Sequence, residues 1–122
     1  MEIIIGSMFV MAGIIHLLPI SGVLGVERLA KLYGRSFDEP NLAILMRHRA
    51  VLFGLLGLFL IYAAFQPALQ PLAFLGGFVS VISFLWLAWQ EDSYNQAIRR
   101  VVIADLVALV SLLIALALWL IK

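Results

Sequence analysis

Four long apolar stretches take up most of this 122-residue chain and constrain what it can fold into. They cover residues 3–20, 42–65, 72–90 and 98–121. A helix needs about 20 predominantly apolar residues to cross the hydrocarbon core of a bilayer, and each stretch is close to or above that length. No linker or low-complexity tract divides the sequence. We therefore predict an all-α integral membrane protein, a four-helix bundle formed by a single domain over residues 1–122.

The basic residues are distributed unevenly among the connections, and this predicts how the chain is oriented. Seven of the eight Lys and Arg residues lie in or beside the first and third connections: Arg28, Lys31, Arg35, Arg47, Arg49, Arg99 and Arg100. The connection at 66–70 has none. Because Lys and Arg resist translocation, we expect the first and third connections to be cytoplasmic and both termini to lie outside.

The first connection is long enough to contain a short amphipathic helix. Its apolar residues recur with helical spacing: Val26, Leu29, Ala30 and Tyr33. Its charged residues take the other side of the same helix: Glu27, Arg28 and Lys31. Such a helix lies in the interface with its apolar face towards the membrane. We expect it to lie at the cytoplasmic surface and to end at Gly34.

Small residues form a stripe along each apolar stretch, and the stripes predict which faces pack together. The members are Gly6 and Gly13 in the first, Ala50, Gly54, Gly57 and Ala64 in the second, Ala73, Gly76, Ser80 and Ser83 in the third, and Ala104, Ala108, Ser111 and Ala115 in the fourth. Helices in lipid associate largely through close backbone approach, which small residues permit. A compact bundle is the simplest interpretation, although the same stripes could face another copy in a homo-oligomer.

The polar residues within the spans predict a site near the cytoplasmic side. Asp105 is the most informative, because an ionisable group inside a span is costly and normally faces a partner or a cavity. Arg47 extends the stripe of the second span, and His16 lies four residues before the end of the first. We expect these three side chains to converge. Further candidates for the same site are His48, Arg49, Ser83, Trp86 and Tyr33.

Two interpretations of this constellation stay open. Asp105 and Arg47 could form an ion pair that locks two helices, with His16 bonded to a backbone carbonyl. Alternatively, the three groups could hold the headgroup of a membrane lipid, a quinone or another amphiphile. The favoured function is a non-enzymatic accessory or amphiphile-binding protein. The alternative is a membrane enzyme or redox partner, with Asp105 or His16 as proton carrier and Arg47 as anion clamp.

Other functional classes find little support in the sequence. The absence of cysteine excludes disulfides, thiolate nucleophiles and iron–sulfur clusters. His16 and His48 could in principle ligate a haem, but His48 is rotated about 100° from the inward stripe, so we predict no cofactor and no metal. The net charge is +1 and its clustering is explained by membrane insertion, so no nucleic-acid partner is expected.

Four segments of the chain carry a resemblance to a known family: GIIHLLP at 13–19, ERLAKLYG at 27–34, MRHRAVLFG at 46–54 and VIAD at 102–105. They resemble a family of small bacterial four-span membrane proteins that is often labelled phosphopantetheine adenylyltransferase. The soluble enzyme of that name has a parallel α/β sheet and a His-x-Gly-His motif, neither of which this sequence supplies. The resemblance implies a multi-pass protein of the bacterial inner membrane. The span count also resembles that of DoxX-type proteins, some of which act with quinones.

The predicted orientation can be tested because the chain contains no natural cysteine. We expect Ala68→Cys to be labelled by a membrane-impermeant maleimide on intact cells, and Ser93→Cys to be labelled only after the membrane is permeabilised. The reverse pattern would show that the orientation is inverted.

Overall fold

The computed structural model describes residues 1–20, 25–33, 39–91 and 93–122, and this part of the chain is almost entirely helical. The α-helices are α1 (Glu2–Leu17), α2 (Val26–Tyr33), α3 (Pro40–Ala64), α4 (Gln70–Gln90) and α5 (Gln96–Ile121), with a short 3-10 helix, η2 (Pro67–Leu69), between α3 and α4. The segments containing α1, α3, α4 and α5 are long and apolar enough to cross a membrane. The predicted all-α membrane bundle, with a short helix between its first two spans, is confirmed.

Side-chain caps set where two of the long helices begin. The carboxylate of Glu39 accepts hydrogen bonds from the backbone N–H groups of Asn41 (3.0 Å) and Leu42 (2.8 Å), and Pro40 occupies the first turn of α3. The side-chain oxygen of Asn95 accepts from the N–H of Ile98 at 2.8 Å. These caps satisfy backbone donors that the helix itself leaves unpaired. Both helices therefore begin slightly before the apolar stretches from which they were predicted.

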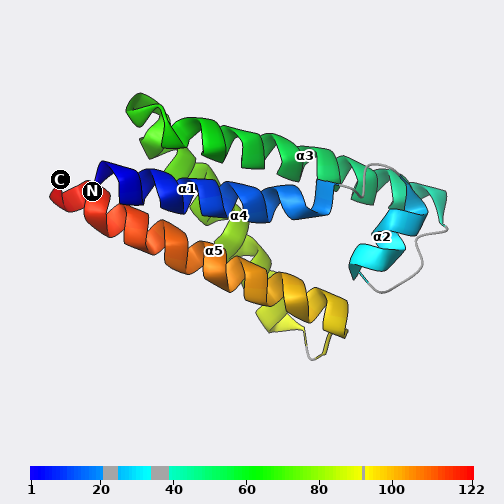
Figure 1. Cartoon of the computed structure of the whole chain (residues 1–122). Coiled ribbons are helices and arrows are strands. Elements are labelled where there is room, and N and C mark those ends of the chain that lie inside the picture. Colours follow the sequence, from blue (N-terminus) through cyan, green and yellow to red (C-terminus); the bar gives the residue numbers. More distant parts are fainter. Residues whose placement is uncertain (21–24, 34–38, 92) are drawn as a thin grey trace.

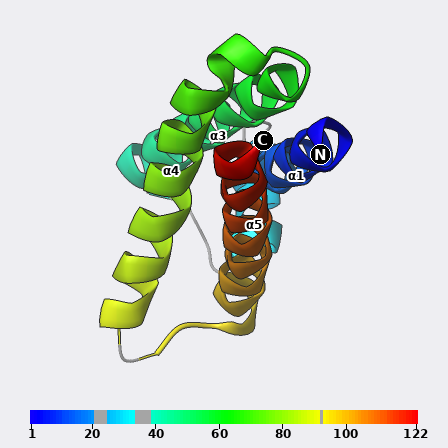
Figure 2. The same cartoon turned by 90° about the vertical axis from the view of Figure 1, so that its left-hand side faces the viewer.

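The four long helices form a closed ring in which each contacts two others. α1 packs against α3 and α5, and α4 packs against the same two helices from the other side. Figure 1 shows α1 between α3 and α5, with α4 behind them and both chain termini at one end. Figure 2, viewed along the bundle, shows the same arrangement and the connection that joins α4 to α5 at the opposite end. We call that opposite end, where α2 also lies, the α2 end.

The apolar core fills the half of the bundle nearest the termini. Its buried members come from all four long helices: Ile5, Phe9, Ala12, Leu60, Ala63, Ala73, Phe74, Val81, Ala108, Leu112 and Ala115. The rings of Phe9 and Phe74 lie 4.7 Å apart at its centre, and Trp119 meets Phe74 edge-on at 5.7 Å. Large apolar side chains also cover the outward faces, as expected of a surface that meets lipid. The buried polar side chains His16 and Asp105 lie towards the other half, near the α2 end, whereas the buried Gln70 lies against Ala63 in the half nearest the termini.

A close backbone contact joins α1 to α3 at two glycines. A Cβ atom placed on Gly57 would lie 2.7 Å from the carbonyl oxygen of Gly13, and one placed on Gly13 would lie 2.7 Å from the carbonyl oxygen of Gly57. Both obstacles are backbone atoms, which cannot move aside as a flexible side chain can. The small-residue stripes thus mark a true packing face on these two helices.

The short helix α2 covers the α2 end of the bundle, where it contacts α3 and α5. Tyr33 at its last turn is only 5% exposed, whereas Glu27 and Lys31 are exposed. The amphipathic character predicted from the sequence is therefore present in these residues. The expected helix end at Gly34, and the basic residue Arg35, lie outside the described residues.

The glycine contact predicts a selective loss of stability. Gly57→Ala should lower the free energy of unfolding by about 1 to 3 kcal/mol, because the added methyl group overpacks a rigid backbone contact. Gly76→Ala is the matched control, since its Cβ would meet only Leu56 at an ordinary 3.4 Å. Unfolding of the purified protein by SDS titration measures both values, and equal losses in the two variants would contradict the proposed contact.

Candidate functional site

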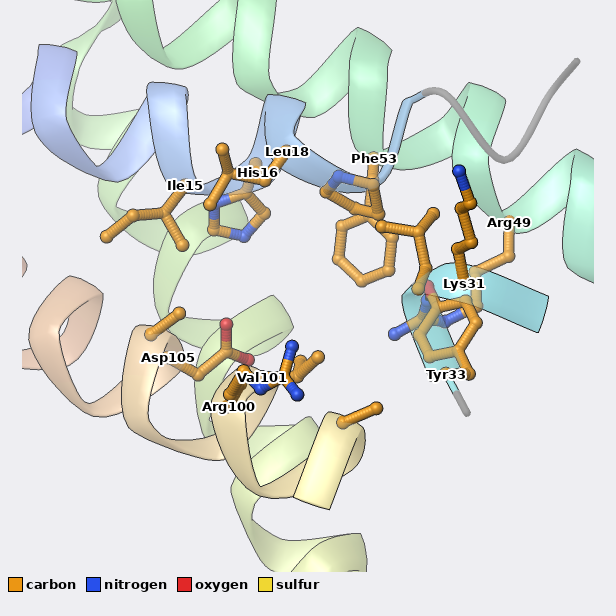
Figure 3. A pocket seen from close by; sticks show the side chains of 14 residues that line it. Ile15, His16, Leu18, Lys31, Tyr33, Arg49, Phe53, Arg100, Val101 and Asp105 are labelled. Atoms are coloured by element: carbon orange, nitrogen blue, oxygen red, sulfur yellow. The ribbon is translucent and has the colours of Figure 1, made fainter. Parts of the chain in front are cut away.

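A cavity of about 230 Å³ lies at the α2 end, between the last turn of α1, α2 and the first half of α5. Arg49 and Phe53 of α3 form its back wall. The polar side chains that line it are His16, Lys31, Tyr33, Arg49, Arg100 and Asp105. The rest of the lining is apolar: Ile15, Leu18, Pro19, Leu32, Phe53, Ala97, Val101 and Ala104. Figure 3 shows how these residues face one another, and we call the space the main cavity.

His16 is held in place by bonds within the fold. Its Nδ1 lies 2.8 Å from the carbonyl oxygen of Ala12, one turn earlier in α1, and its Nε2 lies 2.9 Å from Oγ of Ser80 in α4. Because a carbonyl can only accept, Nδ1 carries the hydrogen, and in the neutral ring Nε2 accepts from the Ser80 hydroxyl. The side chain is 2% exposed. His16 therefore links two helices that face each other diagonally across the bundle.

Arg49 and Tyr33 join α2 to the bundle. A guanidinium N–H of Arg49 donates to the hydroxyl of Tyr33. The same guanidinium lies 4.3 Å from the centre of the Phe53 ring and 5.3 Å from that of Tyr33, within the range of cation–π attraction. The side-chain amide of Asn95 donates to the carbonyl oxygen of Tyr33 at 2.7 Å. The end of α2 is thus attached to both α3 and the start of α5.

Asp105 lies on the cavity side of α5 without a bonding partner in the described part of the chain. Its side chain is 8% exposed, and no described residue gives it a hydrogen bond or an ion pair within 4 Å. Figure 3 shows its carboxyl group directed from α5 towards the side of α1 where His16 lies. Arg49 attracts it across the cavity. A buried carboxylate with so little compensation is costly to the fold.

The cations around the main cavity outnumber its acids. Lys31, Arg49 and Arg100 face Asp105, which leaves an excess of two positive charges in the lining when all four groups are ionised. Lys31 and Arg100 are exposed, whereas Arg49 is partly buried. Figure 3 shows Lys31, Arg49 and Tyr33 together at the side nearest α2, with Asp105 and His16 further from it. The cavity is therefore cationic at its outer side and carries the carboxyl group deeper in the bundle.

A second, larger cavity of about 730 Å³ lies between α3 and α4. It shares three residues with the main cavity, namely Tyr33, Arg49 and Phe53, so these side chains form a common wall. Its other lining residues are Leu42, Met46, Ser80, Ser83, Phe84, Leu87, Ala88, Gln90, Glu91, Tyr94, Asn95 and Ile98. We call it the second cavity.

The expected convergence of His16, Arg47 and Asp105 is only partly correct. His16 and Asp105 line the main cavity together, but Arg47 is exposed and lines neither cavity. The residue nearest to an added Cβ on Gly54 is Ile20, so the α1 segment ends opposite Gly54. Figure 1 shows α3 continuing past that point. Arg47 lies on this part of α3, beyond the end of α1 at Leu17.

The other predicted residues are divided between the cavities and the surface. Tyr33 and Arg49 line the main cavity, whereas His48 is exposed and lines neither cavity. Ser83 is exposed at the second cavity and donates to the carbonyl oxygen of Ser80 at 3.1 Å. Trp86 is 56% exposed on the outer face of α4, 5.6 Å from the ring of Trp89. Trp86, a candidate for the surroundings of the site, therefore lines neither the main cavity nor the second cavity.

Sequence reasoning missed three contributors to the main cavity and its surroundings. The sequence predicts Arg100 as a topological charge, Lys31 as a topological charge on the polar face of the short amphipathic helix, and Ser80 as a small packing residue, but none of the three as a site residue. A signal for Arg100 exists, because residues 97, 100, 101, 104 and 105 all line the cavity and share the i, i+3, i+4 spacing of one helix face. Among the described residues, no group of three or more His, Cys, Asp and Glu side chains is placed to hold a metal ion.

Comparisons with known proteins add no family assignment. No family model, curated protein or solved structure matches this chain.

The bond between His16 and Ser80 predicts a measurable link between α1 and α4. Ser80→Ala should lower the free energy of unfolding by about 0.6 kcal/mol, the average for an interhelical hydrogen bond in a membrane protein, and by up to about 2 kcal/mol. Ser83→Ala is the control, because the exposed Ser83 hydroxyl bonds within its own helix. SDS unfolding of both variants measures the difference. If Ser83→Ala cost as much as Ser80→Ala, the interhelical bond would not contribute.

Proposed function

We propose that this chain is a non-enzymatic membrane protein that binds the polar headgroup of a lipid or similar amphiphile in the main cavity. In this proposal α2 lies at the cytoplasmic face of a bacterial inner membrane. The uneven distribution of Lys and Arg supports that orientation. The bound molecule would enter from the cytoplasmic leaflet, with its apolar part against the helices and its headgroup among the polar side chains.

The observation that carries the proposal is the state of Asp105. An ionisable side chain within a span normally pairs with another group or faces a functional cavity. Asp105 is 8% exposed, lines the main cavity and has no hydrogen bond from a described residue. A group that served only to lock two helices would be expected to have its partner within bonding distance. A carboxyl group left available at a cavity is instead suited to a ligand that supplies the missing donor.

The composition of the cavity lining agrees with a binding role. Ligand sites are lined mainly by apolar side chains with a few polar groups that fix the orientation of the ligand. The main cavity has this character, with apolar walls from α1 and α5 and the polar residues grouped on one side. Basic residues next to the cytoplasmic leaflet favour anionic headgroups.

A catalytic or redox role for the same cavity is not favoured by any observation. Asp105 or His16 was expected as the proton carrier, and both ring nitrogens of His16 are within bonding distance of Ala12 or Ser80. Neither nitrogen is left to exchange a proton with a ligand. Arg47, the expected anion clamp, is exposed and lies outside the cavity lining.

The proposal predicts opposite effects of Asp105→Asn on stability and on binding. The amide keeps the size of the side chain and removes an uncompensated charge, so the ligand-free protein should become more stable by about 1 kcal/mol or more. Retention of the copurifying amphiphile should fall about tenfold, because a hydrogen bond to a charged group is weakened. SDS unfolding measures the first effect, and mass spectrometry of amphiphile per mole of purified protein measures the second.

Glu2→Gln is the matched control. It removes a carboxylate from an exposed ion pair with Lys122 (3.1 Å) at the opposite end of the bundle. Amphiphile retention should be unchanged in this variant. A loss of stability in Asp105→Asn with unchanged retention would indicate a purely structural carboxylate and would refute the proposed function.

A further inference from the structure

We infer that the ligand is a single-chain amphiphile with a phosphate at its polar end and a free hydroxyl between that phosphate and the chain. This inference rests on the proposed function. A monoacyl glycerol phosphate is the simplest molecule with this order of groups. Three observations on the main cavity support the inference: the order of its charged residues along the bundle, its excess of cations, and its small volume.

The charged groups follow a fixed order along the axis of the bundle. Arg100 precedes Asp105 by five residues in α5, which places Asp105 about 7 to 8 Å deeper at 1.5 Å per residue. Figure 3 shows Lys31 and Arg49 on the side of the cavity nearest α2, with Asp105 further from it. A bound amphiphile with its chain towards the bilayer centre thus meets Asp105 first and the cations last.

The cations select an anionic end group. Lys31, Arg49 and Arg100 exceed the single acid by two charges, and the partly buried Arg49 attracts an anion more strongly than it would in water. Arg100 has no hydrogen bond or ion pair to a described residue, so all of its guanidinium donors are available. Guanidinium groups match phosphate oxygens in geometry. A zwitterionic headgroup would leave the excess of two charges uncompensated.

Asp105 selects a hydrogen-bond donor on the chain side of the anion. An ionised carboxylate only accepts hydrogen bonds, so the ligand must donate to it. A diacyl glycerol phosphate has esters at this position, and these are acceptors. A lipid with a second glycerol attached to its phosphate has free hydroxyls too, but they lie on the far side of the phosphate, away from Asp105. A quinone offers carbonyl acceptors and no charge. The glycerol hydroxyl of a monoacyl glycerol phosphate lies where the donor is needed.

The size of the main cavity favours one chain. Its volume of about 230 Å³ is below the roughly 300 to 1,000 Å³ of typical ligand pockets. It can hold a glycerol phosphate and the beginning of a chain, which leaves little room for a second chain. Leu18 in the cavity wall is 60% exposed, so the cavity borders the lipid-facing surface of α1. A single chain can leave the cavity along that surface.

The test compares ligands that differ by one group. Purified full-length protein in an uncharged detergent is titrated with oleoyl glycerol phosphate, with its analogue that lacks the glycerol hydroxyl, and with dioleoyl glycerol phosphate. Oleoyl glycerophosphocholine tests the charge, and glycerol 3-phosphate tests whether a free phosphate ester suffices. Native mass spectrometry or calorimetry gives each Kd. We expect oleoyl glycerol phosphate to bind about tenfold tighter than the analogue without the hydroxyl, the value of one hydrogen bond to a charged group, and to bind tighter than each of the other ligands.

Protein variants then connect each ligand group to its residue. Asp105→Asn should bind oleoyl glycerol phosphate at most about twofold tighter than the analogue that lacks the hydroxyl. The two ligands and the two proteins form a double-mutant cycle, which measures the coupling between Asp105 and the hydroxyl. Arg100→Gln should weaken the binding of oleoyl glycerol phosphate and of its analogue without the hydroxyl about tenfold, because both carry the phosphate. Arg99→Gln is the matched control, because Arg99 is an exposed neighbour that does not line the cavity, and it should leave each Kd unchanged.

The outcomes separate this inference from the proposed function. If the analogue without the hydroxyl, the diacyl lipid or the phosphocholine bound as tightly, and Asp105→Asn still weakened that binding, the ligand class would be wrong and the proposed function would stand. Glycerol 3-phosphate binding as tightly as the acylated form would overturn the inference in favour of a soluble ligand. Binding of every amphiphile unaffected by Asp105→Asn, or no binding at all, would refute both.

Discussion

Inside a bilayer, water does not drive the helices of a bundle together, so α1 depends on direct backbone contact with α3. Gly13 and Gly57 provide it, with each carbonyl oxygen occupying the space that a side chain on the other residue would need. This contact fixes how far along α3 the end of α1 reaches. Because α1 ends before α3 does, a space remains at the α2 end that α2 covers and the main cavity occupies.

The two halves of the bundle are organised by different interactions. Near the termini, aromatic and small apolar side chains form the core, and the buried Gln70 donates to the carbonyl oxygen of Ala63. Near α2, specific bonds replace this packing: His16 to Ser80, Arg49 to Tyr33, and Asn95 to the backbone of α2. Asp105 is the exception, since it is buried without such a bond. Stability given up at a residue that lines a cavity is typical of functional sites.

Features that depend on composition and on position along a helix could be predicted from the sequence. Hydropathy located the spans, and counting residues from the span ends placed His16 and Asp105 at similar depth. Rotation about the helix axis was harder to predict. Arg47 and Arg49 differ by two residues, or about 200°, and therefore lie on nearly opposite sides of α3. The position of the main cavity relative to α3 depends on where α1 ends. The sequence of α3 alone therefore does not show which of the two arginines faces the cavity.

The contact between His16 and Ser80 also could not be predicted, although Ser80 belonged to a predicted stripe. The two helices are diagonal in the ring, and their order around it follows only from the three-dimensional packing.

The common wall between the two cavities has a thermodynamic consequence. Arg49 and Tyr33 bound both spaces, and the hydrogen bond between them holds one position of the guanidinium. A molecule in one cavity that draws Arg49 towards itself changes the shape and charge of the other. By linkage, the occupant of the other cavity must then alter the affinity of the first by the same factor. Any coupling of this kind between the two compartments would pass through Arg49, whose guanidinium both of them share.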